Sequence, residues 1–150
     1  MLRTMFAIAT IAVGVSAVVA QQDVIKQRKD LMKENGNQAK IGAAMAKGEK
    51  PFDLEAARKM FAQFEETATK VAPLWPENSI DQPTADDPYS ASPKIWENMD
   101  DFKARLVKFG TGSKAAGESI KDLDSFKAAF TNIGKNHCTG CHEKYRLKKE

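Results

Sequence analysis

Residues 54–71 read LEAARKMFAQFEETATKV, and the spacing of their apolar side chains decides the fold class. Apolar residues recur at alternating intervals of three and four positions, which places them on one face of an α-helix: Leu54, Ala57, Phe61, Phe64, Ala68 and Val71. Asp53 precedes this stretch and suits the N-cap position, and Pro73 ends it. The stretch therefore predicts an amphipathic helix that buries one face.

Two more stretches show the same helical periodicity. Within residues 22–45, Val24 and Leu31 lie seven positions apart on one face. Ser92 and Pro93 form a good helix start, because proline suits the first helical position. An apolar seam with steps of three and four follows them: Ile95, Met99, Phe102, Leu106, Phe109, Ser113, Ala116 and Ile120. These stretches predict a first and a third helix.

The fourth helical stretch begins at Asp124, which is predicted to be its N-cap. Its seam runs toward the C-terminus: Phe126, Phe130, Ile133, His137 and Cys141. Residues 73–92 contain four prolines and are predicted to form a loop, and no segment alternates apolar and polar residues as a strand would. The sequence therefore predicts an all-α, up-down-up-down antiparallel four-helix bundle. A three-helix domain with a loose first helix is the alternative.

The first twenty residues are predicted to be a secretory signal peptide. Arg3 supplies one positive charge, residues 5–15 are apolar, and small residues precede Gln21. We expect cleavage after Ala20, which leaves residues 21–150 as one domain, soluble and exported to the periplasm of a bacterial host. The apolar run is shorter than the ~20 residues that span a bilayer, so a membrane anchor is the less favoured alternative.

The composition limits the kinds of function. Of 150 residues, 42% are hydrophobic and 29% are charged, which fits a globular chain with one core. The net charge of +3 falls to +2 without residues 1–20, because that segment holds one of the 23 basic residues and none of the 20 acidic ones. So small a surplus argues against nucleic-acid binding, and two cysteines are too few for a disulfide scaffold.

Both cysteines lie in the stretch Cys138-Thr139-Gly140-Cys141-His142. This C-x-x-C-H pattern is the attachment signature of c-type haem. Two thiols three residues apart share one helical face, so each can add to one vinyl group of the same haem. His142 then supplies an imidazole for the iron. The sequence predicts one covalent haem c near the C-terminal end of the fourth helix, with Cys138, Cys141 and His142 as its attachment and metal residues.

Three other uses of the same residues compete with haem. A thiol–disulfide redox motif requires a βαβ setting, which this chain does not suggest. A zinc site from His137, Cys138, Cys141 and His142 places four ligands on one helix, where they cannot surround a tetrahedral ion well. A disulfide between Cys138 and Cys141 closes so short a loop that it stabilises little. His137 is interpreted as a helix residue beside the site.

Haem function depends on the ligand opposite His142, and methionine is the candidate. In an up-down-up-down bundle, the first and third helices start at the end where the fourth helix finishes. Met32 and Met99 therefore reach a depth similar to that of His142, whereas Met45 and Met60 lie farther away. Depth alone does not decide whether Met32 or Met99 is the second ligand of the iron.

The sequence from residue 21 onward resembles the class II cytochromes c, which include cytochrome c prime and a low-spin branch with a methionine ligand. The resemblance rests on these stretches: Gln21-Gln22-Asp23, Leu31-Met32-Lys33, Gly48-Glu49-Lys50-Pro51, Tyr89, Ser92-Pro93-Lys94-Ile95-Trp96, Ile133-Gly134-Lys135 and Cys138 to Arg146. It is strongest to the low-spin branch and implies that Met32 is the second metal ligand. It also implies that Arg28 and Arg146 approach the haem propionates, to which a guanidinium is suited.

The predicted function is that of a soluble periplasmic electron carrier, which is not an enzyme. A His142/Met32 pair holds iron in both oxidation states and leaves no position for a substrate. Its partners are expected to be other redox proteins, and the resemblance allows a homodimer. The alternative is a five-coordinate cytochrome c prime that binds nitric oxide or carbon monoxide.

Overall fold

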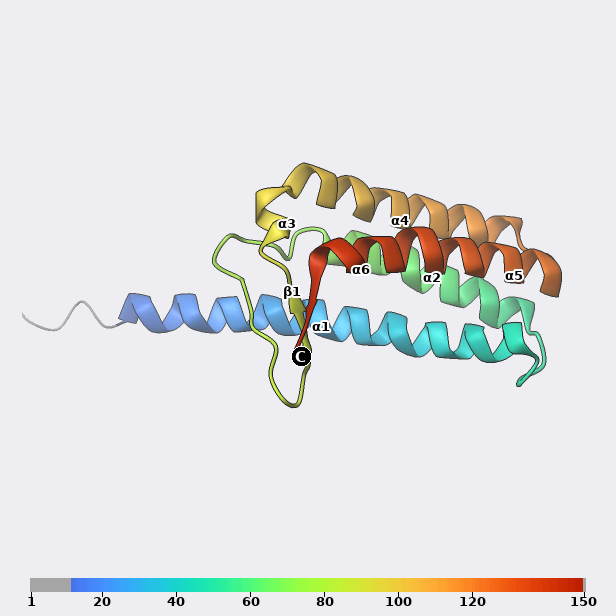
Figure 1. Cartoon of the computed structure of the whole chain (residues 1–150), viewed down its shortest axis with the longest axis horizontal. Helices are drawn as coiled ribbons and strands as arrows, with labels where there is room; N and C mark the ends of the chain where they lie inside the picture. The colour runs from blue at the N-terminus through green and yellow to red at the C-terminus, as the bar shows by residue number, and fades with distance from the viewer. Residues whose placement is uncertain (1–11, 150) are drawn as a thin grey trace, which may run out of the picture.

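The computed structural model describes residues 12–149, and side chains from residue 21 onward. Four long helical stretches form a bundle (Figure 1): α1 (Ala12–Lys47), α2 (Leu54–Val71), α4 (Met99–Ser119) and a last stretch composed of α5 (Leu123–Asn132), η1 (Ile133–Thr139) and α6 (Gly140–Tyr145). The short helix α3 (Lys94–Glu97) precedes α4. The predicted four-helix bundle is confirmed.

The predicted signal peptide remains a prediction, and residues 1–11 of it lie outside the described residues. Helix α1 begins at Ala12 and continues past Ala20, the residue before the expected cleavage point. None of the helices in the described part of the chain combines the length and apolar character that a membrane span requires.

The turn between α1 and α2 has a defined geometry. Gly48 has a φ of +77°, a conformation that glycine adopts at little cost. The amide of Glu49 donates to the carbonyl of Ala44 at 2.9 Å, and that of Gly48 donates to Met45 at 3.1 Å. This pair of bonds is a Schellman motif, which ends α1 and reverses the chain. At the start of α2, the Asp53 carboxylate accepts a bond from the backbone of Ala56 at 3.0 Å, as predicted for an N-cap.

Two local predictions are wrong. The N-cap of the fourth helical stretch is Asp122, not Asp124: its carboxylate accepts from the Ser125 amide at 2.8 Å within a capping box. The chain also forms two short strands, β1 (Tyr89–Ala91) and β2 (Arg146–Lys148). They pair antiparallel, with Ser90 opposite Leu147, so the predicted loop ends in a strand and the fourth helical stretch ends at Tyr145.

The core consists of two clusters. The first, which we call the distal cluster, is built around these buried side chains: Met45, Ala57, Met60, Phe61, Phe64, Ala68, Phe109, Ala116, Ile120, Phe126 and Ile133. The second, the site cluster, consists of buried Val71, Ile95, Phe102, Leu106 and Tyr145, with Leu31, Met32, Trp75, Ala91, Trp96, Met99 and Cys141 packed against it. Because Cys138 packs against the distal cluster and Cys141 against the site cluster, the two cysteines lie where the clusters meet.

Candidate haem site

The Cys-Thr-Gly-Cys-His stretch spans the junction of η1 and α6. Across it, the amide of Gly140 donates to the carbonyl of Lys135, five residues back, which is the bond of a π-helix. Wider turns of this kind are frequent at functional sites. The π-segment ends at Thr139 and α6 then carries Cys141 and His142, so both halves of the motif belong to one continuous helical stretch.

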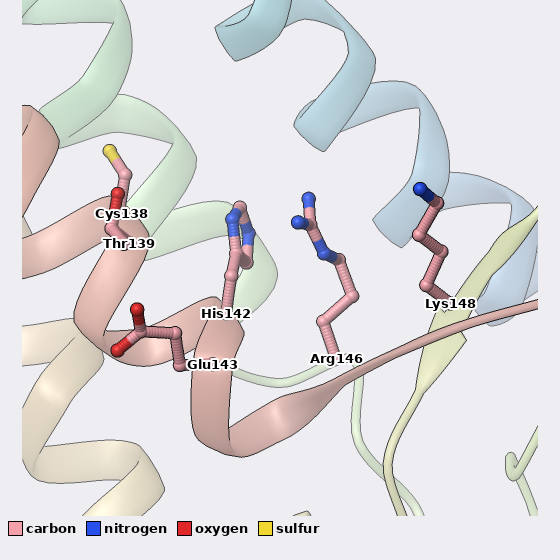
Figure 2. A pocket seen from close by; sticks show the side chains of 6 residues that line it. All are labelled: Cys138, Thr139, His142, Glu143, Arg146 and Lys148. Atoms are coloured by element: carbon pink, nitrogen blue, oxygen red, sulfur yellow. The ribbon is translucent and has the colours of Figure 1, made fainter.

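An open pocket of about 230 Å³ lies at this junction. Its lining residues come from η1, α6 and β2: Cys138, Thr139, His142, Glu143, Arg146 and Lys148. Figure 2 shows the side chain of His142, from α6, and that of Arg146, the first residue of β2, extending side by side into the space toward α1. Helix α1 packs against α2 and α5, but in the described part of the chain this close packing does not extend to η1 and α6.

The electrostatics of the pocket favour neutral ligands. Burial and then the nearby charge of Arg146 lower the pKa of His142 to about 4. Burial, with a smaller effect of Cys141, raises the pKa of the Cys138 thiol to about 11, and burial also raises that of Cys141. At neutral pH the imidazole therefore keeps its free electron pair for a metal, and both cysteines are thiols.

The competing uses of the motif find no support in the described residues. These contain no group of three or more His, Cys, Asp or Glu side chains arranged to hold a metal ion. Cys138 and Cys141 are both free thiols. The only strand pairing in the described part of the chain is an antiparallel ladder of two strands, which is not the βαβ setting of a thiol–disulfide enzyme. The Cys138 thiol and the neutral His142 imidazole line one pocket, and Cys141 packs against the adjoining site cluster. This set suits a covalently attached haem.

The other candidate ligands fall into two groups. His137 lies against α4, because a Cβ added to Gly112 would come within 3.1 Å of its Nε2, and it does not line the pocket. Met45 and Met60 are buried in the distal cluster. Met32 and Met99, like Cys141, pack against the site cluster. The depth argument predicted this separation of Met32 and Met99 from Met45 and Met60.

The two arginines expected near the propionates lie in different surroundings. Arg146 lines the pocket, and its guanidinium lies 4.3 Å above the Tyr89 ring. Arg28 is 4% exposed and does not line the pocket. Its guanidinium donates to the Ser79 hydroxyl at 2.8 Å, to the Ser79 carbonyl at 2.7 Å and to Asp81 at 3.2 Å. In this structure Arg28 therefore holds the loop between α2 and β1 against α1.

Two further residues, Glu143 and Lys148, line the pocket as well. Glu143 follows His142 directly, so its position near the site was open to prediction from adjacency. Lys148 is on β2, and its place in the pocket depends on a strand that the sequence pattern does not indicate.

Comparison with known proteins agrees with this site. The sequence model of the family described as Cytochrome C' matches residues 23–146. Cytochrome c-556 of Rhodopseudomonas palustris is 40% identical over 148 residues, covering 99% of both chains. Cytochrome c' of the same organism is also 40% identical, over 95% of this chain and 97% of that one. A solved structure of cytochrome c' from Rhodopseudomonas palustris superimposes with a TM-score of 0.76 at 36% identity, over 85% of this chain and 98% of that one. The chain therefore belongs to the cytochrome c' family, whose members carry one covalently attached haem c.

Proposed function

We propose that the protein is an exported, periplasmic monohaem electron carrier whose haem is bound through Cys138 and Cys141, with His142 and Met32 as the axial ligands. The observation that carries the proposal is that Cys138 and His142 line one pocket, which opens toward α1, the helix of Met32. The 40% identity to a cytochrome c-556 supports the same role.

When bound, the haem supplies a one-electron couple at its iron. The chain's own residues then have separate tasks. His142 offers a neutral imidazole, because its pKa is lowered to about 4. Arg146 offers a guanidinium for a propionate carboxylate. The aromatic rings of the site cluster keep water away from one side of the site.

The surroundings of α6 support Met32 over Met99. Figure 2 shows His142 extending toward α1, and Met32 belongs to that helix. Met99 begins α4, and α4 bonds through Asp101 to Lys144 and Tyr145 of α6. Neither of these α6 residues lines the pocket, so the bonds to α4 are separate from the pocket. The role of Arg28 at a propionate remains a prediction, and it requires Arg28 to leave its contacts with Ser79 and Asp81.

The alternative is a five-coordinate protein that binds nitric oxide or carbon monoxide. It is favoured by the equal identity, 40%, to the cytochrome c' of Rhodopseudomonas palustris. The two proposals differ in whether Met32 binds iron or only shields the haem.

Absorption spectroscopy of the reduced holoprotein tests the proposal. With Met32 bound we expect sharp low-spin α and β bands that carbon monoxide does not change readily. Met32→Ala should then give a high-spin spectrum that shifts with carbon monoxide, while Met99→Ala, the matched control from the same cluster, should keep the wild-type bands. A wild-type protein that is already high-spin supports the gas-binding alternative. A switch caused by Met99→Ala instead assigns the ligand to Met99.

Export and assembly are separate proposals. We expect the mature chain to begin at Gln21 and to carry one haem, which mass spectrometry of the periplasmic fraction measures. A mass equal to the bare chain contradicts haem attachment. The partners are expected to be redox proteins, and sedimentation measures whether the holoprotein is a monomer or a homodimer.

A further inference from the structure

One carboxylate oxygen on α4 accepts hydrogen bonds from three side chains. Oδ2 of Asp101 accepts from the Tyr145 hydroxyl at 2.5 Å, from Lys144 Nζ at 2.9 Å and from Arg105 Nε at 2.9 Å. Tyr145 and Lys144 belong to α6, so the carboxylate bonds the last turn of the haem-attachment helix to α4.

Arg105 extends the same connection to the start of α6. Its Nη1 donates to the Gly140 carbonyl at 3.3 Å, and its guanidinium carbon lies 5.9 Å from the Tyr145 ring. Arg105 is four residues after Asp101, so the two form one pair on the same face of α4. Together they contact the first and the last residue of α6, Gly140 and Tyr145.

These contacts use residues of α6 that do not line the pocket. His142 lines the pocket, whereas Gly140, Lys144 and Tyr145 face α4 through the bonds described. At about 100° per residue, Lys144 lies on the far side of the helix from His142, and Tyr145, three residues after His142, lies on a neighbouring face. Neither Asp101 nor Arg105 lines the pocket, so the pair acts on His142 through the position of α6.

These contacts hold the end of the fourth helical stretch in place. Helix α6 forms its last six residues, directly after the π-segment. Tyr145 is also 3% exposed and packs edge-on against Phe102 at 5.2 Å. Its hydroxyl therefore reaches Asp101 from a ring that is held in the core, and the bond fixes the rotation of α6 about its axis.

We propose that Asp101 is a positioning residue for the haem: by bonding Tyr145 and Lys144 of α6, it sets the orientation of the His142 imidazole. The inference rests on His142 as an axial ligand, as proposed above. Hydrogen bonds from Tyr145, Lys144 and Arg105 hold the pKa of Asp101 far below its usual range. The carboxylate is thus ionised at neutral pH, and its bonds are of the stronger, charge-assisted kind.

The test compares three variants of the holoprotein: Asp101→Asn, Asp101→Glu and Asp100→Asn. Asp100 is the matched control, because it is exposed in the same first turn of α4 and makes no side-chain bond to α6 in the described part of the chain. The readout is the set of haem-methyl proton shifts of the oxidised protein, because their order and spacing depend on the orientation of the axial imidazole plane.

We expect Asp101→Asn to change the spacing of these shifts. Asp101→Glu should retain part of the wild-type spacing, and Asp100→Asn should retain all of it. A lower melting temperature with an unchanged shift pattern would mean a purely structural role and overturns the proposal. An equal change in Asp100→Asn also overturns it, because the effect would then come from charge alone.

If Asp101→Asn does not fold, Tyr145→Phe decides the question, since it removes one hydroxyl and leaves the ring in the core. A wild-type pattern in Tyr145→Phe then refutes the positioning role, and an altered pattern supports it. The absorption spectrum of the reduced wild-type holoprotein is measured first, and it reports the ligands of the iron independently of any variant. A failure of the proposed His142/Met32 ligation is therefore seen before any Asp101 variant is compared.

Discussion

Two glycines of α1 give opposite predictions for the same substitution. A Cβ added at Gly42 would lie 2.6 Å from Sδ of Met60 and 2.8 Å from Cε2 of Phe130. At Gly36, on the same helix, a Cβ would meet nothing within 4 Å. Glycine to alanine therefore tests whether α1 approaches α2 and α5 as closely as the structure indicates.

The magnitudes follow from helix propensity and packing. Alanine in place of glycine inside a helix stabilises by about 0.5–1 kcal/mol, and Gly36→Ala should gain this amount in full. At Gly42 the same gain is opposed by overpacking, which costs about 1–3 kcal/mol. The upper part of that range applies, because Met60 is fully buried and Phe130 is stacked on Phe126 at 5.5 Å. We expect Gly42→Ala to lose roughly 2 kcal/mol net.

Thermal unfolding of the holoprotein, followed by far-ultraviolet circular dichroism, measures both variants. At roughly 4 °C per kcal/mol for a domain of this size, Gly42→Ala should melt about 8 °C below the wild type and Gly36→Ala about 2–4 °C above it. A Gly42→Ala protein that melts as high as Gly36→Ala would refute the close approach of α1 to Met60 and Phe130.

Three further outcomes are expected. Arg28→Leu should destabilise the protein by roughly 3 kcal/mol, because it removes one partner of a buried ion pair, and limited proteolysis should then cut between residues 72 and 88. In a haem-free form, the pKa of His142 is lowered from an ordinary 6.5 to about 4, so the contribution of this residue to stability is present above pH 6.5 and is lost as pH falls toward 4. Urea unfolding at several pH values measures the free energy of unfolding, and a free energy that does not change over this range contradicts the prediction. Asp122→Ala should lose about 1 kcal/mol of stability through its N-cap, whereas Asp124→Ala should change the melting temperature less.

The helices were predictable because their signals are local and repeated. The apolar seam of residues 54–71 has the helical period, and Asp53 and Pro73 mark its ends. All residues of the predicted seam are buried in α2 except Leu54, which is half-buried. Met60 and Thr67 are buried as well, although they were not part of that seam. The Cys138–His142 motif was predictable for the same reason, since five adjacent residues carry the chemistry.

The features that the sequence did not reveal depend on partners far along the chain or on small changes of the backbone. Strands of three residues are too short for a period-two pattern, and β1 is defined by pairing with β2, over fifty residues later. Arg28 shares a helix face with Met32, but its bonds go to Ser79 and Asp81 in a loop without a periodic pattern. The π-segment replaces i→i+4 by i→i+5 hydrogen bonds, and an apolar period of three and four does not indicate where such wider turns occur.

The half-buried face of α1 has a physical explanation once haem is part of the fold. Val24 and Leu31 lie on the predicted face of the first helix, next to the apolar residues Ile25 and Met32, yet all four are only partly buried. Within the described residues, α1 does not pack closely on η1 or α6. Exposed apolar area of this kind costs free energy unless another apolar surface covers it. The family's haem is flat and largely apolar, and the pocket that holds Cys138 and His142 opens toward this face. A haem attached as proposed would cover this face, so the apolar side chains of the first helix would contact the cofactor as well as protein.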